Sequence, residues 1–365
     1  MDFRRTDEAS ETPRRGMLLA LAGLGAIPAV GMVASGGIAR PRNAPDDTQG
    51  GSEEGVGEWL DVRRFGARCD GRSDDSVAVQ AAIDAACAAP LPPPISVPGV
   101  CLLTQPILVR RPVDRAKAVL RIIGMGPGAG FRSSRKGAMF VGEAASDGSP
   151  GTEFLRFETI RFEGTSSAAG PVMSGDFLRI SFTWCEFIAI ACLVSERYAQ
   201  EWRFIGCTAR GWRGPFFAAA GGYGVTSSNG KYQFGGPAFR LVDPTLRKSG
   251  CVGCSFIQDI YEGSNGPFLE FELGKGVSVA GLYAEDIESP TIIVGARARS
   301  AGVSITGCFF GTRPDNVKAS DFGEIMWNNV SGAASIGNVA VGRLHHRDER
   351  AVDFVSLGDH DGVAP

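Results

Sequence analysis

The sequence predicts an all-β solenoid that is closed at its N-terminal end by one α-helix. Glycine accounts for 50 of the 365 residues, about twice its usual share, while the hydrophobic fraction stays at 44%. Short alternating strands recur from residue 153 onward, and a single amphipathic helix precedes them at 75–87. Tight turns between many short strands require glycine, because it adopts left-handed backbone conformations without steric cost.

The recurring strands share an alternation of apolar and polar residues that is broken by Gly, Asn or Ser. They lie at 157–164, 180–187, 202–207, 251–256, 277–283 and 303–310. Neighbouring strands are offset by roughly 20–28 residues, with one gap of about twice that, and such a period indicates stacked coils. We expect a strand, a turn, a second strand and a second turn to fill one coil. A β-sandwich has similar strand spacing, but it gives no role to the helix.

The helix at 75–87 is predicted from its apolar stripe and its boundaries. Val79, Ile83 and Ala86 recur at helical spacing, and the prolines at 92–94 stop the helix. The stripe is expected to bury against the first coil.

Three carboxylates, Asp70, Asp74 and Asp75, come just before this helix. We expect them to cap the helix and to close an Asx-type turn, because carboxylates are favoured at a helix N-terminus. A metal-binding or catalytic cluster is the alternative interpretation. A position at the end of the solenoid argues against it, because that end is distant from a groove along the coils.

The segment from Phe65 to Asp84 reads Phe-Gly-Ala-x-x-Asp-Gly-x-x-Asp-Asp, then Val-Gln-Ala-Ala-Ile-Asp after three residues. It resembles the opening of proteins of the pectate-lyase-like superfamily, of the rhamnogalacturonase and epimerase type. The segments 95–103 and 122–128 extend the resemblance, with Cys101 where tyrosine is usual. The resemblance covers about residues 60–130. It implies a single-stranded, right-handed parallel β-helix with an N-terminal capping helix.

The resemblance also implies an exported carbohydrate-active protein that cleaves an acidic polysaccharide by lyase or glycoside hydrolase chemistry. The Gly-His-Gly of polygalacturonases and the Trp-Ile-Asp-His of pectate lyases are absent, so neither of these two activities is implied. A non-catalytic glycan-binding or structural β-helix protein is the alternative. The resemblance implies Ca²⁺ as a cofactor of such an enzyme, and no other cofactor is indicated.

The chain begins with features of an export signal. Arg14 and Arg15 precede an uncharged, glycine-rich run from Met17 to Ala34, which resembles a twin-arginine signal. Removal of the signal leaves no stable membrane span, and we expect a periplasmic or extracellular location. The sequence thus divides into an export signal at 1–39, a flexible linker at 40–58, a β-helix domain at 59–342 and a C-terminal tail at 343–365.

The expected partner is a polysaccharide or an oligosaccharide. The formal net charge of −3 is spread along the chain without charged blocks, so neither nucleic acid nor an anionic membrane surface is indicated. The oligomeric state is left open.

The nine cysteines are scattered, without two Cys-x-x-Cys pairs at zinc-site spacing. We expect buried thiols that pack as small hydrophobic side chains, rather than a disulfide framework. When the repeats are aligned on the dipeptide Gly-Cys, Cys207, Cys254 and Cys308 fall at the same position of their coils. The repeat at 277–283 has Leu282 at that position.

Two acidic segments, Gln258–Glu262 and Glu285–Glu288, are the candidate catalytic site. If Asp259 and Asp286 both face outward, they stack about 5 Å apart, because neighbouring coils have that spacing. Close carboxylates divide the roles of acid and base in glycosidases. Glu262 and Glu285 are further candidate catalytic residues in this cluster. The sequence does not identify metal ligands. A solvated acidic face is the alternative interpretation.

Basic and aromatic residues complete the candidate site. Arg210 is a candidate base or charge clamp in a β-elimination, and Arg213 is a candidate substrate contact. Tyr261, Tyr283 and Trp212 are candidates for stacking on sugar rings. Trp212 belongs to a glycine-rich stretch that would overhang the groove, and a hydrophobic patch covering the coil is equally compatible with it.

Overall fold

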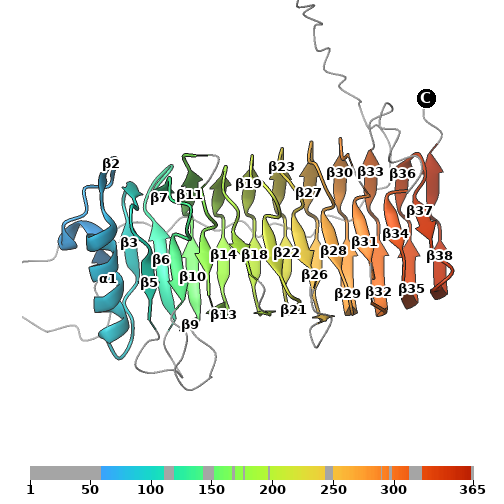
Figure 1. The fold of residues 1–365 in the computed structure, drawn as a ribbon, viewed down its shortest axis with the longest axis horizontal. Coiled ribbons are helices and arrows are strands. Elements are labelled where there is room, and N and C mark those ends of the chain that lie inside the picture. The colour runs from blue at the N-terminus through green and yellow to red at the C-terminus, as the bar shows by residue number, and fades with distance from the viewer. Residues whose placement is uncertain are drawn as a thin grey trace, which may run out of the picture. The chain divides into compact units, whose positions relative to one another are not determined.

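The computed structural model describes residues 59–362, except 111–118, 143–151, 167–168, 176, 196–197, 243–249, 289, 296–297 and 312–322. These residues form a parallel β-solenoid whose coils follow one another along a single axis (Figure 1). The predicted export signal and linker lie outside the described residues. In the part that is described, no helix has both the length and the apolar character needed to cross a membrane.

Three parallel sheets run along the solenoid, and each described coil except the first and the last contributes to all three. Sheet A has 17 strands: β1 (Leu60–Asp61), β3 (Ile95–Val97), β6 (Leu120–Gly124), β9 (Thr152–Glu153), β10 (Leu155–Glu158), β13 (Phe177–Leu178), β14 (Ser181–Thr183), β17 (Ala199–Gln200), β18 (Arg203–Ile205), β21 (Gly222–Tyr223), β22 (Thr226–Ser228), β25 (Cys251–Val252), β26 (Ser255–Ile257), β29 (Lys275–Ala280), β32 (Ser300–Thr306), β35 (Val330–Ile336) and β38 (Ala351–Leu357).

Sheet B has 12 strands: β2 (Asp70–Asp74), β4 (Val100–Leu102), β7 (Gly130–Ser133), β11 (Arg161–Gly164), β15 (Glu186–Ile188), β19 (Thr208–Arg210), β23 (Lys231–Gln233), β27 (Ile260–Glu262), β30 (Tyr283–Glu285), β33 (Phe309–Gly311), β36 (Val339–Val341) and β39 (His360–Gly362). Sheet C has 10 strands: β5 (Ile107–Val109), β8 (Phe140–Gly142), β12 (Met173–Ser174), β16 (Leu193–Val194), β20 (Phe217–Ala219), β24 (Phe239–Leu241), β28 (Leu269–Phe271), β31 (Ile292–Val294), β34 (Ile325–Trp327) and β37 (His345–Arg347).

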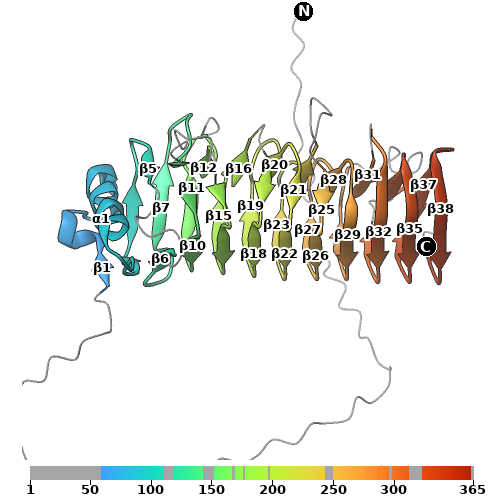
Figure 2. The ribbon, with the colours of Figure 1, turned by 90° about the horizontal axis from the view of Figure 1, so that it is seen from below.

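The N-terminal end of the solenoid is covered by α1 (Ser76–Ala88), next to the short 3₁₀ helix η1 (Val62–Phe65). Figure 2 shows α1 across the end of the coils, beside β5. Val79, Ile83 and Ala86 are almost completely buried, as the apolar stripe predicts. The predicted parallel β-helix with an N-terminal capping helix is confirmed.

Two of the three carboxylates before α1 act as predicted, whereas Asp75, at the N-cap position, makes no side-chain cap hydrogen bond and accepts instead from the backbone N–H groups of Arg68 and Cys69. Asp70 accepts hydrogen bonds from the backbone N–H groups of Arg72 and Ser73, which closes an Asx turn. Asp74 accepts one from the backbone N–H of Ser76 at the start of the helix. Hydrogen bonding lowers the pKa of both carboxyl groups to about 2, chiefly from the backbone N–H of Ser73 for Asp70 and from the hydroxyls of Ser76 and Thr104 for Asp74.

The corner between sheets A and B, which we call the A–B corner, has two residues in every coil from 159–160 to 358–359. The first has a positive φ and the second points into the solenoid. The first residues are Thr159, Trp184, Gly206, Asn229, Gln258, Gly281, Gly307, Gly337 and Gly358. The second residues are Ile160, Cys185, Cys207, Gly230, Asp259, Leu282, Cys308, Asn338 and Asp359.

This corner partly confirms the predicted cysteine alignment. Cys207, Leu282 and Cys308 do share one position, but Cys254 does not. Gly253 and Cys254 lie between β25 and β26, at a bend within sheet A. The dipeptide Gly-Cys therefore occurs at two different corners, because both need a residue with positive φ followed by a buried one. Eight of the nine cysteines are buried, as predicted, and Cys69 is half-buried.

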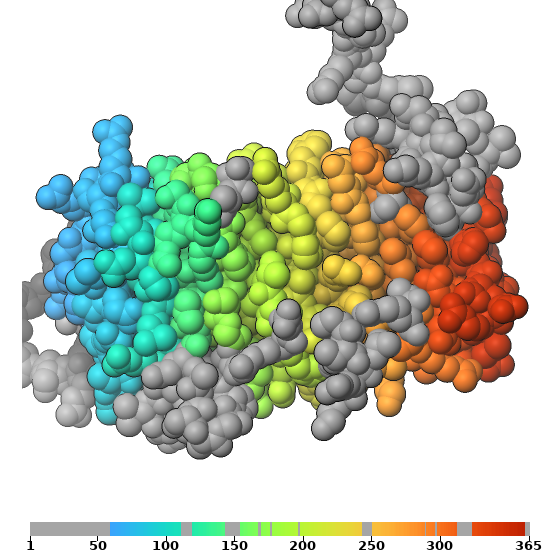
Figure 3. All heavy atoms as spheres, viewed as in Figure 1, coloured from blue at the N-terminus to red at the C-terminus, as the bar shows by residue number. Residues whose placement is uncertain are grey.

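Aromatic ladders fill the core. On the inner face of sheet A, Phe182 stacks on Phe157 at 5.1 Å between ring centroids and on Phe204 at 5.4 Å, with interplanar angles of 8°. Equivalent residues of neighbouring coils stack in this way because parallel strands lie about 4.8 Å apart. Side chains fill the spaces between the ribbons, and the coils form continuous bands on the surface (Figure 3).

Two expectations about the coils need correction. Each coil passes through three sheets rather than consisting of two strands, because a sheet C strand follows the sheet B strand, and several coils have two strands in sheet A, such as β13 and β14. The charged segment after residue 342 is not a tail as far as Gly362. It forms β37, β38 and β39, which pair in register with β34, β35 and β36 and complete another coil.

Candidate functional site

The predicted stack of Asp259 on Asp286 is wrong. The register of β27 and β30 places Glu262 opposite Glu285 and Tyr261 opposite Ala284. Asp259 comes before this pairing, at the inward position of the A–B corner, and Asp286 follows it at the other end of sheet B. The two carboxylates predicted to share a catalytic role are therefore separated by the width of the sheet.

Asp259 is buried, with 1% of its surface exposed. Its Oδ1 accepts hydrogen bonds from the backbone N–H of Gly230, at 2.7 Å, and from Oγ of Ser227, at 2.9 Å. Oγ of Ser227 also lies 2.8 Å from the hydroxyl of Tyr232. Loss of hydration on burial raises the pKa of Asp259 to about 7, against the opposing effect of these bonds. The group belongs to the interior of the solenoid and does not face a surface ligand.

Two candidates for stacking on sugar rings are also core residues. Tyr261 is fully buried, and its hydroxyl donates to the carbonyl of Gly266 at 2.8 Å. Trp212 is 2% exposed, and its Nε1 donates to the carbonyl of Pro237 at 3.1 Å. Both side chains point into the solenoid, because inward and outward positions alternate along the chain here. The overhanging aromatic loop expected around Trp212 is therefore not formed.

Glu262, Glu285 and Tyr283 do lie together on the outer face of sheet B. Glu262 is close to Nζ of Lys231, at 3.7 Å, and accepts a hydrogen bond from Gln233. The hydroxyl of Tyr283 donates to Oε2 of Glu285 at 2.8 Å. Partial burial and the charge of Glu285 raise the pKa of Tyr283 to about 12. The phenol therefore stays protonated at neutral pH and holds the carboxylate of Glu285 in place.

Arg210 belongs to a different part of the same face. Its guanidinium lies 3.2 Å from Oε1 of Glu186, while Arg161 in the coil on the other side lies 2.7 Å from Oε2. Glu186 thus joins two arginines. Arg213 is exposed and lines a separate hollow near Thr165 and Ala191. The structure does not bring either arginine next to Glu262 and Glu285.

A hollow of about 390 Å³ lies at the A–B corner and includes Trp184. Its other lining residues include Gly126, Thr159, Arg161 and Glu186. The indole of Trp184 is 66% exposed. An exposed tryptophan beside an arginine–carboxylate pair offers an apolar surface and hydrogen-bonding groups at one place, which is the combination that binds a sugar ring.

Trp184 has an unfavourable backbone conformation, with φ of 53°. Bulky side chains rarely adopt this region, and such strain is concentrated at functional positions. Gly206 occupies the same position in the next coil, and a Cβ added there would lie 2.4 Å from Cε3 of the indole. The ring therefore lies against the backbone of Gly206, and its opposite face is open.

The sequence alone indicates no role for Trp184, because this residue lies inside the segment 180–187, which is predicted to be one strand. The strand in fact bends at Trp184, between β14 and β15. The glycines and the asparagine at the same position of later coils were the available signal for this bend.

A second hollow, of about 320 Å³, lies on the outer face of sheet A beside the first. Arg156 and Arg203 project from β10 and β18, on either side of the short side chain of Ser181 in β14. Both arginines are exposed, and neither forms a salt bridge with a residue that the structure describes. Arg179 also lines the hollow and pairs with Glu201 at 3.3 Å.

A third polar group, in the last coils, has the residues of a catalytic triad but a different geometry. Nε2 of His345 lies 3.4 Å from Oγ of Ser335 and 3.1 Å from Oδ2 of Asp359. In a triad the serine and the carboxylate contact opposite ring nitrogens. Here Nδ1 instead accepts a hydrogen bond from Nε1 of Trp327, at 3.2 Å. The group stabilises the core of the last coils.

Among the described residues, one group of side chains has the spacing of a metal site: Cys69, Asp75 and Cys101 at the N-terminal end. Its two sulfur ligands are unsuited to Ca²⁺, which prefers oxygen.

Comparisons with known proteins show the fold. No model of a known protein family matches the sequence, and a comparison with curated proteins found no significant match. Among solved structures, the tailspike protein of Acinetobacter baumannii phage AM24 is similar with a TM-score of 0.63 and 17% identity, over 83% of this chain and 54% of the tailspike.

Two further structures have the same fold. A tailspike protein of the A. baumannii bacteriophage Fri1, a capsular polysaccharide depolymerase, has a TM-score of 0.58 and 9% identity, over 83% of this chain and 59% of that one. PfbA, a surface adhesin of Streptococcus pneumoniae, has a TM-score of 0.50 and 12% identity, over 84% and 92%. This chain spans little more than half the length of the tailspikes. It is a three-sheet parallel β-solenoid with the pectate-lyase-like β-helix fold.

Proposed function

We propose that the protein binds an extracellular polysaccharide at the A–B corner, with one sugar ring stacked on Trp184. The exposed indole beside the hollow lined by Arg161 and Glu186 is the observation that carries this proposal. Its exposure gains no packing energy, and its positive φ costs roughly 1–3 kcal/mol. A ligand that covers the open face of the ring supplies a reason for both features.

The hollow beside the corner favours an acidic polysaccharide. Arg156 and Arg203 are two coils apart and face the same hollow, with the hydroxyl of Ser181 between them. Guanidinium groups bind carboxylate and sulfate oxygens in a bidentate manner. The neighbouring sugar of a chain stacked on Trp184 would place its acidic group here.

The known roles of two structural neighbours are compatible with this proposal. One is a capsular polysaccharide depolymerase and the other is a surface adhesin. Both act outside a cell, as the predicted export signal implies for this chain.

Binding assays with Trp184→Ala test the proposal. We expect the variant to bind a uronate polysaccharide about tenfold more weakly than the wild type, which corresponds to about 1.4 kcal/mol. Phe234→Ala is the matched control, because Phe234 is also 67% exposed with a φ of 53° but lies at the opposite edge of sheet B. Equal affinities of the Trp184 variant and the wild type would contradict the proposal.

Cleavage of the polysaccharide is a second candidate function. Glu262 and Glu285 are in register on adjacent coils, whose spacing of about 4.8 Å is near the separation of about 5 Å used by retaining glycosidases. New reducing ends on incubation with polysaccharide, lost in both Glu262→Gln and Glu285→Gln, are expected if the pair is catalytic. Turnover that persists in both variants would exclude it.

A further inference from the structure

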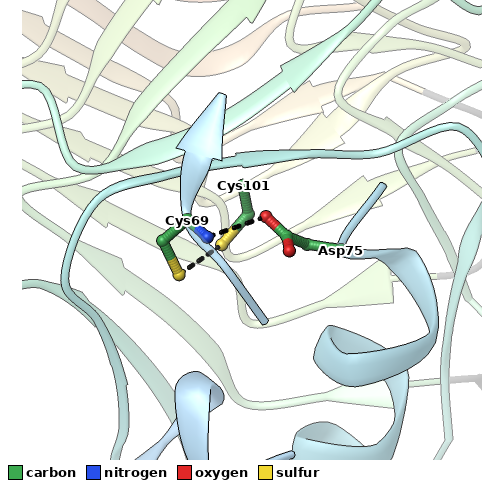
Figure 4. A group of neighbouring side chains, drawn as sticks. All are labelled: Cys69, Asp75 and Cys101. Atoms are coloured by element: carbon green, nitrogen blue, oxygen red, sulfur yellow. Dashed lines mark hydrogen bonds between the residues drawn. The ribbon is translucent and has the colours of Figure 1, made fainter. Parts of the chain in front are cut away.

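We propose that Cys69 and Cys101 form a disulfide bond by exchange with a small-molecule disulfide, and that this bond locks the capping helix onto the first coil. Their Sγ atoms are in direct contact, 3.3 Å apart. Figure 4 shows the two side chains pointing toward one another. A disulfide bond is about 2.05 Å long, so a small movement of two side chains closes it.

The backbone holds Cys69 in the position that makes this contact. Its N–H donates to Oδ2 of Asp75 at 3.1 Å, and its carbonyl accepts from the N–H of Val100 at 3.1 Å. Asp75 also accepts from the N–H of Arg68, at 2.7 Å. Cys69 has a φ of 53°, which these bonds maintain, and its side chain is directed at β4, where Cys101 lies (Figure 4).

Cys69 is also the cysteine that a dissolved oxidant reaches. All nine cysteines are described, and the other eight are buried. An accessible thiol in contact with a second thiol is the arrangement of cysteines that are oxidised selectively.

The chemistry takes two exchange steps. The thiolate of Cys69 attacks one sulfur of a disulfide such as oxidised glutathione, forms a mixed disulfide and releases one thiolate. Cys101 then loses its proton and attacks Sγ of Cys69, which expels the second glutathione thiolate. Two protein thiols are oxidised, one glutathione disulfide is reduced by two electrons to two thiols, and the protons of Cys69 and Cys101 pass to the two released thiolates.

The bond would close a chain segment that contains the whole cap. The segment between Cys69 and Cys101 includes β2, α1 and β3. A cross-link here restricts the unfolded chain, so it stabilises the cap against separation from the coils. It requires no change in the register of β2 and β4, which already pair in parallel.

Mass spectrometry of the full chain tests this proposal. After reduction, removal of reductant and exposure to oxidised glutathione, we expect a protein about 2 Da lighter, with one cross-linked peptide pair containing Cys69 and Cys101. The remaining seven cysteines should react with an alkylating reagent after unfolding. The melting temperature should rise on oxidation in the wild type and in Cys87→Ser, but not in Cys69→Ser.

The Cys101→Ser variant provides a sharper test, because it stops the reaction after the first step. It should accumulate glutathione on Cys69, whereas Cys69→Ser should remain unmodified. Absence of the adduct in folded Cys101→Ser would overturn the proposal. So would a purified wild type that holds one equivalent of zinc and resists oxidation until a chelator removes it, since Cys69, Asp75 and Cys101 would then be metal ligands.

Discussion

The backbone N–H of Gly230 donates a 2.7 Å hydrogen bond to the carboxyl group of Asp259 in the next coil of the solenoid. A glycine is required at this position, because a Cβ would lie 2.9 Å from Oδ1 of Asp259 and 2.7 Å from the ring of Tyr232. Oδ2 of Asp259 is buried without a hydrogen-bond partner among the described residues. The carboxyl group is therefore held in place through one oxygen, in a setting that opposes its ionisation.

Stability should fall as the pH rises from about 4 to about 7. The pKa of Asp259 is about 7 in the folded protein and 3.8 in an ordinary aspartate, so the folded state retains a proton that the unfolded state releases. The difference corresponds to about 4 kcal/mol, lost across this range. Burial raises the pKa of Glu324 to about 7 as well, and it adds to the same slope.

Denaturant unfolding of Asp259→Asn at several pH values checks this expectation. The variant should show a shallower loss of stability between pH 4 and 7 than the wild type. Glu349→Gln, at an exposed position of the last coils, should leave the slope unchanged. A slope that is the same in Asp259→Asn and the wild type would show that Asp259 ionises normally.

Substitution of Gly206 by alanine should weaken polysaccharide binding. Its φ of 60° costs an alanine about 1 kcal/mol, and its new Cβ would displace the indole of Trp184. Gly307→Ala is a matched control, because Gly307 has a φ of 58° at the same corner with no atom within 4 Å of an added Cβ. We expect both variants to lose similar stability, and only Gly206→Ala to lose affinity. Equal affinity in the two variants would contradict the assigned role of the ring.

Removal of one ring from the core ladder should be costly. Phe182 is fully buried between Phe157 and Phe204, so Phe182→Ala should lower the free energy of unfolding by about 3–5 kcal/mol. Phe234→Ala, which removes an exposed ring, should change it by less than about 0.5 kcal/mol. Chemical denaturation measures both. Similar losses in the two variants would be inconsistent with the ladder.

The pKa of Tyr283 should fall when Glu285 is replaced by glutamine. Hydrogen bonding to Glu285 and the charge of that carboxylate both raise this pKa, in addition to partial burial. Ultraviolet absorbance titration, with Tyr283→Phe used to isolate the signal of this tyrosine, provides the measurement. An unchanged titration in Glu285→Gln would show that the two side chains do not interact in solution.

The fold was predictable because its signals are local. The motif from Phe65 to Asp84, the stripe of Val79, Ile83 and Ala86, and the regular spacing of strands each depend on nearby residues. Burial of Cys207, Leu282 and Cys308 at one position followed from the same repeat.

The candidate site was less predictable because it depends on register. Gln258–Glu262 and Glu285–Glu288 have similar sequences, and this similarity would place Asp259 opposite Asp286. The observed register pairs Glu262 with Glu285 instead, which differs from that alignment by four residues. The inward positions of Tyr261 and Ala284 decide the pairing, since a slip of one residue would turn Tyr261 outward. The exposed position of Trp184 could not be predicted for a related reason. A two-residue bend gives little sequence signal when its first residue is not glycine or asparagine.

The constant two-residue length of the A–B corner gives that edge of the molecule evenly spaced side-chain positions. Side chains at its first position recur once per coil, at intervals of about 4.8 Å, and no insertion interrupts the series between Thr159 and Gly358. Tryptophans introduced at Gly281 or Asn229 would stand at known multiples of this interval from Trp184. Binding measured against the length of an oligosaccharide would then report how the repeat of a sugar chain matches the repeat of the protein.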